Sequence, residues 1–368
     1  MEDAQIELLW ITSPPNMYYL SGYDAWSFYV HQGLLVELGE PMPIWIGRGI
    51  DLACAKLTSI LDDENLFGYD DKYVTGDSHA MTFVAETIKR KGWGTRRIGV
   101  EMDTHYYSAQ ADGVLRQSLP DAQFCNADKL VNWIRLVKSP QEIEYMKQAG
   151  EITDLAMRSA LEMIEPGIEQ NKVAGEIFKN LIAGHPAYFG DMPDYQTIPM
   201  GAKTAAPHLT WSDDPFRIGE VCTLELGANR FRYTAPLART IFLGEPTPYF
   251  AKLQEVVRDG LEAALGAIKP GATCEMIEHA WRKEISKSNV IKKSRIGYSV
   301  GIGYPPDWGE RTASIADGDK TCLQPGMTMH LMLGIWRDEH GYELSETFCV
   351  TETGCFCLSG LPREMTVK

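Results

Sequence analysis

Short apolar runs alternate with amphipathic stretches through the first third of the chain. Four runs have the length and apolar content of strands, namely residues 6–12, 33–38, 44–49 and 97–103. Two stretches, residues 79–94 and 107–120, have the spacing of amphipathic helices. Strands alternating with helices indicate an α/β domain with a parallel or mixed sheet. The domain is expected to end near "LVNWIRLVKSP", and its predicted bounds are residues 1–135.

A helix start of unusual clarity opens the second part, for which the predicted bounds are residues 136–368. Ser139 can cap the helix, Pro140 suits its first position, and Glu142 stands three residues after the serine. This arrangement is a capping box, and it predicts an amphipathic helix that runs to "IEPG" at residues 164–167.

The second part contains an internal repeat. "IEPG" at residues 164–167 returns as "IKPG" at residues 268–271, and a helix is expected before and after each copy. Each copy then reaches a strand led by glycine, "GEVCTLELG" and later "GMTMHLMLG". The repeat predicts an α+β domain of two similar halves related by a pseudo-twofold axis, with helices outside a curved antiparallel sheet. A cleft between such halves is a favourable site for a small ligand.

Composition narrows the choice of partners. The 368 residues are 44% apolar and 23% charged, with a net charge of −15 and no block of like charges. This balance argues against nucleic acid or an anionic membrane as partner. No stretch approaches the roughly 20 apolar residues of a membrane span. The eight cysteines are scattered, which is typical of reduced thiols in a cytoplasmic protein.

Glu225 is the most unexpected residue in the pattern. It lies in "TLELGANRFRYTAPLARTIF", residues 223–242, which reads as two antiparallel strands around a polar turn. An ionised carboxylate in a buried strand is costly unless it is paired or hydrogen-bonded. One reading is a salt bridge to Arg230, Arg232 or Arg239 of the same hairpin. The other is a working carboxylate that acts as nucleophile, general base or anchor for a cation.

Two histidines can take part in such chemistry. His208 lies beside Trp211 in the proline-flanked loop "AAPHLTWSDDP", where it is either exposed or a catalytic base. His330 alternates with its neighbours on an expected strand, and is either a core histidine or part of a site.

Two stretches rich in aromatic residues suit recognition of a small cation. "GYPPDWGERT" at residues 303–312 combines Asp307, Trp308 and Arg311, and "SGYDAWSFYVHQ" at residues 21–32 contains Trp26. Buried packing is the alternative for both. The sequence contains no H-E-x-x-H zinc motif, P-loop, dinucleotide fingerprint or G-x-S-x-G elbow.

The whole chain resembles the creatinase/aminopeptidase P/methionine aminopeptidase superfamily. The resemblance rests on the two aromatic-rich segments above, together with "IRLVKSPQEI" and "YTAPLARTIF". The resemblance implies a creatinase-type N-terminal α/β domain followed by a catalytic domain of the pita-bread fold. "GYPPDWGERT" and "WSFYVHQ" are closest to the branch that opens the cyclic amidine ring of ectoine.

The resemblance also bears on metal binding. Peptidases of the superfamily hold two metal ions with two aspartates, a histidine and two glutamates. The corresponding residues here are Glu225, Pro236 or its neighbour, Tyr298, Met332 and Ser345. Only one of these five is a carboxylate, so the set is unsuited to a dinuclear site for hard cations. The expectation is therefore an enzyme without metal or other cofactor, and a metal-dependent peptidase is disfavoured.

The function implied by the resemblance is hydrolysis of a carbon–nitrogen bond in a small cationic or zwitterionic substrate. Glu225 would attack the amidine carbon or activate water, and His208 would carry a proton to the leaving nitrogen. The residues expected to contact substrate are Trp26, Trp211, Tyr298, Asp307, Trp308, Arg311, His330 and Glu346. A creatinase-like hydrolase or lyase and a metal-free binding protein are the alternatives. A homodimer is expected, with Trp26 and His31 reaching the partner's site.

Overall fold

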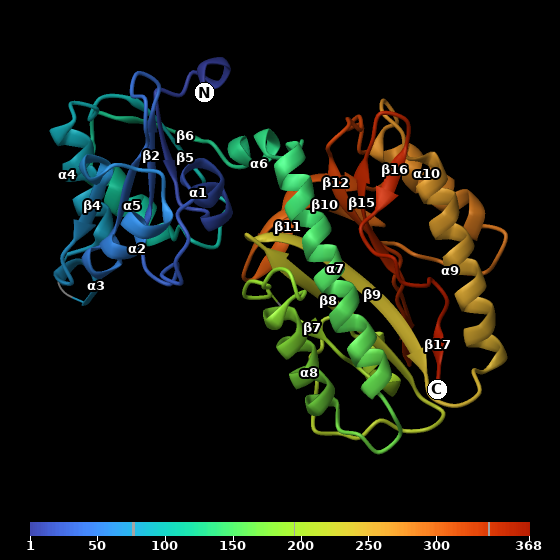
Figure 1. Ribbon diagram of the computed structural model, residues 1–368. Coiled ribbons are helices and arrows are strands. Elements are labelled where there is room, and N and C mark those ends of the chain that lie inside the picture. The colour runs from blue at the N-terminus through green and yellow to red at the C-terminus, as the bar shows by residue number, and fades with distance from the viewer. Residues whose placement is uncertain (76–77, 195, 338) are drawn as a thin grey trace. The chain divides into compact units, whose positions relative to one another are not determined.

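The computed structural model describes residues 1–75, 78–194, 196–337 and 339–368. The chain forms two compact units, Met1–Trp133 and Ile134–Lys368, so the division falls two residues before the boundary expected from the sequence. Each unit has its own sheet and its own helices (Figure 1).

The first unit contains a six-stranded sheet with the strand order β4-β3-β2-β1-β5-β6. Only β2 runs antiparallel to its neighbours; the other pairs are parallel. The strands are β1 (Leu8–Ile11), β2 (Gly33–Glu37), β3 (Ile44–Arg48), β4 (Leu66–Tyr69), β5 (Arg97–Val100) and β6 (Gln123–Asn126). The four strands expected from the sequence are confirmed; β4 and β6 are additional.

Helices accompany this sheet. They are α1 (Pro14–Ser21), α2 (Leu52–Thr58), α3 (Lys72–Thr75), α4 (Ala80–Arg90), α5 (Ala109–Ser118) and, at the end of the unit, α6 (Leu130–Ile134). Successive residues of β1 enter different cores, because Trp10 packs with one cluster and Leu9 with another. A strand buried on both faces is typical of a largely parallel sheet. The predicted α/β character of this unit is confirmed.

The second unit begins with the long helix α7 (Pro140–Met163). Its capping box is formed: the Ser139 backbone N–H donates to Glu142 Oε2 at 2.7 Å, and the Glu142 N–H donates to Ser139 Oγ at 3.4 Å. The other helices of this unit are α8 (Gln170–Ala183), α9 (Pro248–Ala267) and α10 (Cys274–Ile285).

A nine-stranded sheet forms the centre of the second unit. Seven strands follow the order β16-β15-β12-β10-β9-β8-β7, while β11 pairs with β10 and β17 with β9. A separate hairpin consists of β13 (Ile335–Arg337) and β14 (His340–Tyr342). The sheet strands are β7 (Gln196–Thr197), β8 (Val221–Arg230), β9 (Tyr233–Phe242), β10 (Gly297–Tyr304), β11 (Asp307–Ile315), β12 (Thr328–Met332), β15 (Ser345–Val350), β16 (Cys355–Cys357) and β17 (Thr366–Val367).

The internal repeat is confirmed by equivalent contacts after α7 and α9. Gly167 has a φ of 93° and donates its N–H to Phe216 O at 2.8 Å; Gly271 has a φ of 82° and donates to Leu323 O at 2.9 Å. Positive φ values favour glycine, which explains why both copies of the motif end in this residue. The next helix follows within three residues in each half.

One face of the sheet is covered by helices and the other carries polar side chains. In the first half, Leu224 and Leu226 of β8 pack with apolar residues of α7 and α8. In the second half, Leu331 of β12 packs with those of α9 and α10. Because side chains alternate along a strand, Glu225 and His330 point to the opposite face. The fold therefore brings one polar residue from each half to the same surface of the sheet.

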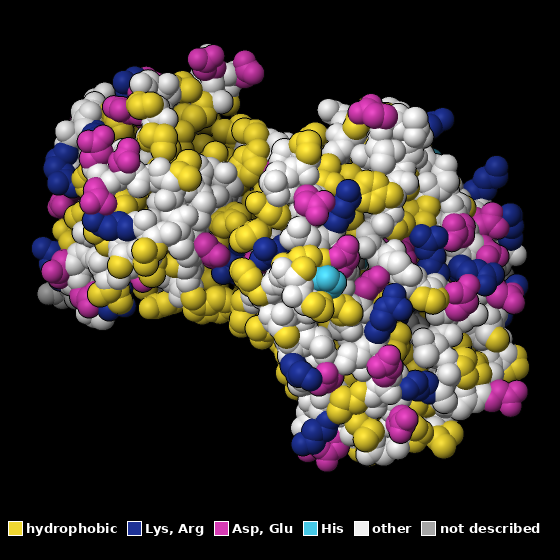
Figure 2. All heavy atoms as spheres, in the orientation of Figure 1, with side chains coloured by type: hydrophobic (Ala, Val, Ile, Leu, Met, Phe, Trp, Pro, Cys, Tyr) yellow, Lys and Arg dark blue, Asp and Glu magenta, His cyan; other side chains and the backbone are white. Residues whose placement is uncertain are grey.

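The surface agrees with the charge pattern of the sequence. On the face drawn in Figure 2, acidic and basic side chains are interspersed, without a large area of a single sign. In the part of the chain that the structure describes, no helix combines the length and hydropathy needed to cross a membrane.

Candidate active site

Glu225 lies in the middle of β8, opposite Ala238 of β9, and only 4% of its surface is exposed. Burial raises the pKa of its carboxyl to about 7, and nearby His208 has the opposite, weaker effect. Among the described residues, its ion-pair partner is a histidine and not an arginine. Arg239, for example, pairs with Glu346 instead. A carboxyl group buried without a cationic partner is a candidate for chemistry.

His330 of β12 contacts Glu225 across the sheet, with 3.6 Å between His330 Nε2 and Glu225 Oε1. Thr347 Oγ1 donates its single proton to Pro236 O at 2.7 Å, and lies 3.0 Å from His330 Nδ1. Since the hydroxyl proton is used, Nδ1 must be the protonated nitrogen that donates to Thr347. Nε2 is then an acceptor, and it has no hydrogen-bond partner among the described residues.

The histidine is held neutral by its surroundings. Burial lowers the pKa of His330 to about 3, against the smaller opposing effect of Glu346. A neutral imidazole with a free Nε2 can accept a proton or a hydrogen bond, but at neutral pH it cannot act as an acid. The expected role of His330 in the site therefore has a defined chemistry, that of an acceptor beside Glu225.

Two aromatic residues complete this part of the site. Tyr298 of β10 lies opposite His330 in the ladder, with ring centroids 5.6 Å apart. Trp308 of β11 is fully buried and donates from Nε1 to Tyr298 Oη at 3.0 Å. A Cβ on Gly227 would lie 3.3 Å from the Trp308 ring, so glycine two residues after Glu225 leaves room for the indole. Both expected aromatic residues are thus placed close to Glu225 and His330.

A second buried carboxyl, which sequence reasoning missed, belongs to Glu343. It is 1% exposed. Burial, and next the charge of Glu225, raise its pKa to about 8. Lys292, 4% exposed, lies near it, and burial lowers the pKa of that amine to about 8. The sequence contains the pattern that could have identified it, a glutamate between apolar residues: Glu343 stands between Tyr342 and Leu344, just as Glu225 stands between two leucines.

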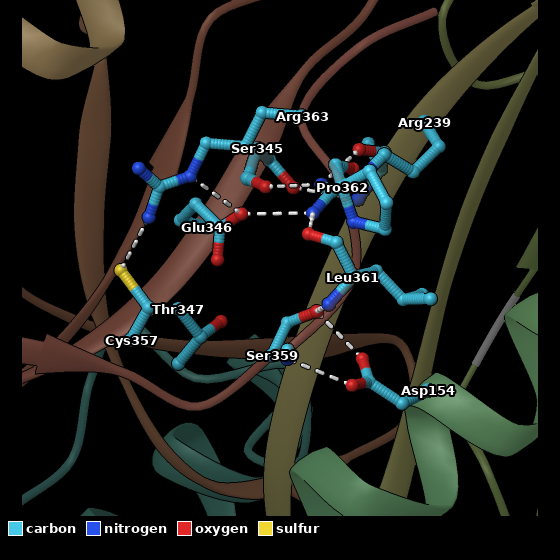
Figure 3. Close-up of polar contacts among 12 residues, drawn as sticks. Asp154, Arg239, Ser345, Glu346, Thr347, Cys357, Ser359, Leu361, Pro362 and Arg363 are labelled. Atoms are coloured by element: carbon cyan, nitrogen blue, oxygen red, sulfur yellow. Dashed lines mark hydrogen bonds and ion pairs between the residues drawn. The ribbon is translucent and has the colours of Figure 1, made fainter. Parts of the chain in front are cut away.

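Glu346 points to the helix-covered side of the sheet. Its Oε1 accepts hydrogen bonds from Arg239 Nη2 at 2.8 Å and from Arg363 Nε at 3.3 Å (Figure 3). In the ladder Glu346 lies opposite Leu331, whereas its neighbour Thr347 lies opposite His330. Its carboxylate is therefore engaged by two arginines, and the structure does not bring it to Glu225.

His208 and Trp211 belong to the same loop, but their side chains lie in different surroundings. His208 is exposed, and its charge acts on Glu225, so the ring lies within electrostatic reach of that carboxyl. Trp211 instead contacts Phe178 of α8, with ring centroids 5.6 Å apart, and is 38% exposed. The structure places His208 within electrostatic reach of Glu225 and Trp211 against the outer helix.

The remaining candidates are Asp307, Arg311 and Trp26. Asp307 and Arg311 have exposed side chains on β11, and Arg311 has a φ of 57° at an irregular part of that strand. Trp26 belongs to the first unit, where it is 54% exposed and contacts Phe28 with ring centroids 4.7 Å apart. Their contacts with substrate stay predictions.

The five positions associated with metal ligands do not form a suitable donor set. The Tyr298 hydroxyl accepts from Trp308, and burial raises its pKa, so it remains a neutral phenol. Ser345 Oγ accepts from the Ala238 N–H at 2.6 Å, and Met332 offers only a soft thioether. Within the described ranges, no group of three His, Cys, Asp or Glu side chains has a geometry suited to a metal ion. Hard divalent cations require several oxygen ligands, so the residues present do not fit a dinuclear centre.

Comparison with known proteins agrees with this architecture. Residues 1–137 match the creatinase/prolidase N-terminal domain and residues 144–352 match metallopeptidase family M24. Over 377 residues the chain is 42% identical to the ectoine hydrolase of Halomonas elongata, covering all of this chain and 94% of that protein. It is equally similar, at 42% over 371 residues and with the same coverage, to the uncharacterized hydrolase/peptidase y4tM of Sinorhizobium fredii.

Solved structures show the same fold at lower identity. The prolidase of Thermococcus sibiricus is 19% identical and superposes with a TM-score of 0.87, covering all of this chain and 96% of that one. The two matching domains, the shared fold and the full-length similarity lead to one conclusion. The chain belongs to metallopeptidase family M24, with a creatinase/prolidase N-terminal domain, and is an ectoine hydrolase-like member of the creatinase/aminopeptidase P superfamily.

Proposed function

We propose that the protein is a metal-independent hydrolase that opens the cyclic amidine ring of ectoine or 5-hydroxyectoine and releases N-acetyl-2,4-diaminobutyrate. The 42% identity to an ectoine hydrolase over the full chain supports the substrate class. The reaction type is supported mainly by the buried Glu225, whose ion-pair partner among the described residues is the neutral His330 at 3.6 Å.

The chemistry of an amidinium matches these groups. Its central carbon is electrophilic, and its two ring nitrogens carry N–H donors. The Glu225 carboxylate either attacks that carbon or removes a proton from an attacking water. His330 Nε2, which needs a donor, accepts from a ring N–H. Each buried acceptor thereby gains the partner that the protein does not provide.

The leaving nitrogen needs a proton, because an amide anion is too basic to leave. By resemblance to creatinase, His208 is the candidate for this transfer. Its exposure at the site also suits exchange of protons with water. Trp308 and Tyr298 supply aromatic surface for the cation, and Arg311 is the candidate for the substrate carboxylate.

Ring opening of ectoine followed by NMR tests this proposal. The purified protein is incubated separately with ectoine, 5-hydroxyectoine and creatine, and the acetyl signals of ectoine and its ring-opened product are integrated. Conversion of an ectoine but not of creatine supports the proposal. Conversion of creatine alone would favour a creatinase-like enzyme, although Ala238 stands where an acid is expected in that enzyme.

A binding protein without activity is the remaining alternative. Such a protein has no need of a buried carboxyl aligned with a neutral histidine, and keeping Glu225 in β8 lowers its stability. The Glu225–His330 pair therefore supports an enzyme. Absence of conversion of all three compounds would favour the binding protein.

We also propose that the enzyme acts as a homodimer in the cytoplasm. All eight cysteines are free, which suits a reducing compartment. In the dimer, Trp26 and His31 of the first unit would approach the site of a second copy. Light scattering during size-exclusion chromatography tests the assembly, and a mass near 41 kDa, that of one chain, would contradict it.

A further inference from the structure

Glu343 enters the site from a short segment between β14 and β15. The Thr240 side chain fixes its backbone twice: Oγ1 accepts from the Glu343 N–H and donates to the Glu343 carbonyl oxygen, both at 2.8 Å. Thr240 lies opposite Thr223, which is two residues before Glu225 on the same strand. Residues two apart share a face, so Glu343 is anchored on the face of the sheet that carries Glu225.

The carboxyl of Glu343 is only half satisfied. Its Oε1 accepts from Trp336 Nε1 at 2.9 Å, while Oε2 is buried and has no hydrogen-bond partner in the described part of the chain. Lys292 does not bond it, because its amine donates to Gly334 O at 2.8 Å and lies 4.4 Å from the Trp336 ring centroid. A buried carboxyl oxygen without a hydrogen-bond partner destabilises the fold, and such an oxygen is a feature to be explained.

The charge of Glu225 acts on Glu343. Among the described residues, the titratable groups that interact electrostatically with Glu343 are Glu225 and Cys222 of β8 and, from the loop before β10, Lys292. Thr240 and Trp336, its neighbours on β9 and β13, do not titrate. Burial keeps the Cys222 thiol protonated by raising its pKa. Two adjacent carboxyls cannot both ionise easily in a buried site, so the pair holds one shared proton near neutral pH.

We propose that Glu343 is the second carboxyl of the active site, and that it donates the proton that the leaving ring nitrogen needs while Glu225 acts as the carboxylate. This inference rests on the proposed function and assigns to Glu343 the step that resemblance gives to His208. His330 cannot supply the proton, because its only N–H is held by Thr347.

The proton balance closes on the water route. Glu225 takes a proton from water as the hydroxyl adds to the amidinium carbon. The carbon–nitrogen bond then breaks with its electron pair on nitrogen, which takes the proton of Glu343. The hydroxyl proton of the adduct returns to Glu343 as the amide carbonyl forms, and the proton on Glu225 passes to the amine. If Glu225 instead adds to the amidinium carbon itself, the leaving ring nitrogen still needs the proton of Glu343.

Glu343→Gln is the direct test, since glutamine keeps an acceptor for Trp336 but cannot release a proton. We expect kcat to fall about 10²–10⁴-fold with little change in KM. The decline of the wild-type rate above about pH 8, where Glu343 ionises, should disappear. Trp336→Phe removes a hydrogen bond that lowers the pKa of Glu343, so the same decline should move to higher pH. Glu352→Gln, on an exposed residue, is the matched control and should behave as the wild type.

Two results would contradict the role proposed for Glu343. If Glu343→Gln keeps the decline at high pH, or if His208→Asn removes it instead, the inference is wrong. Difference infrared spectroscopy of the free protein gives a readout that needs no substrate. Wild type should show the carboxyls of Glu225 and Glu343 titrating above pH 6, beside that of Asp194, whose pKa burial also raises to about 7. Glu225→Gln and Glu343→Gln should each remove one signal, and Asp194→Asn identifies the third. If wild type fails to open ectoine, the proposed function fails, and the spectra alone decide on the pair: a Glu343→Gln spectrum that loses no carboxyl titrating above pH 6 overturns it.

Discussion

At the scale of single residues, the site is marked by buried polar atoms that the described protein leaves without hydrogen-bond partners. His330 Nε2 and Glu343 Oε2 are both buried and unpaired in the described chain. Each such atom lowers stability by about 1–3 kcal/mol. A bound amidinium would remove that cost, because a ring N–H can donate to His330 Nε2 and the other ring nitrogen can receive the proton of Glu343. The unpaired atoms thus indicate both where the substrate binds and what hydrogen-bonding groups it presents.

Thr347 controls the state of His330, which leads to a first prediction. Thr347→Val keeps the shape of the side chain but removes the hydroxyl that links His330 Nδ1 to Pro236 O. The imidazole then loses its fixed tautomer, and we expect kcat to fall about 10-fold or more. Thr347→Ser keeps the hydroxyl and should retain most of the activity. Equal activity in the two variants, measured by initial rates, would show that the hydroxyl does not matter.

Glu225 should lower stability as well as provide activity. Its pKa is raised to about 7 in the folded protein from an ordinary 4.5, so the folded state keeps a proton that the unfolded chain releases. Stability is therefore lost as pH rises from about 4.5 to 7, by on the order of 3 kcal/mol. Glutamine at this position carries no charge at any pH.

We predict that Glu225→Gln is inactive yet unfolds at a higher temperature than wild type. The difference should be small at pH 5 and largest above pH 7. Thermal unfolding followed by circular dichroism at pH 5 and pH 8 checks this. A Glu225→Gln protein that is less stable than wild type at pH 8 would mean that the carboxylate has a stabilising partner in the fold.

Site residues could be predicted from the sequence where a residue type does not suit its expected structural surroundings. A carboxylate in an apolar strand identified Glu225, and the density of aromatic residues identified Trp308. The same reasoning applies to Glu343, which stands between Tyr342 and Leu344, but the sequence analysis did not single it out. Trp211 shows the limit of the approach, since no pattern in a loop tells which neighbour its indole contacts.

At the scale of elements, the repeat makes a prediction about its glycines. Gly167 has a φ of 93° in the turn after α7, whereas Gly175 lies within α8, where a Cβ would have no neighbouring atom within 4 Å. Alanine at 167 should destabilise the protein by about 1–2 kcal/mol because of its Cβ. Alanine at 175 should stabilise it by about 0.5–1 kcal/mol.

The pseudo-symmetry requires the same behaviour in the other half. Gly271 has a φ of 82° after α9, and Gly266 within that helix also has open space. Gly271→Ala should therefore resemble Gly167→Ala, and Gly266→Ala should resemble Gly175→Ala. Midpoints of urea unfolding for the four variants provide the measurement. Opposite signs in the two halves would contradict the equivalence of the turns.

Elements with a strong local signal were predictable, and short ones were not. The capping box at Ser139 and the glycine turns indicated α7 and the repeat, because these signals lie in neighbouring residues. Strand β4 contains a glycine, and β6 is the polar-ended "QFCN". Their strand conformation comes from pairing with β3 and β5, which are distant in sequence, so local patterns do not indicate them.

At the scale of the whole molecule, each half of the second unit contributes different residues to the proposed site. Glu225 and the fixed carbonyl of Pro236 come from the first half, and His330 with Thr347 from the second. The sheet that joins them also holds Glu346 with Arg239 and Arg363 on its other side. A site built across the repeat is positioned by the entire sheet and not by one loop.

The central claim is that a carboxylate, and not a metal centre, drives hydrolysis of a cyclic amidine. Its most direct test is ectoine ring opening followed by NMR with protein exhaustively treated with EDTA, comparing wild type with Glu225→Gln. The account predicts full turnover by the treated wild type and none by the folded variant. Loss of wild-type activity on chelation, restored by added Mn²⁺ or Zn²⁺, or retained activity in Glu225→Gln, would contradict it.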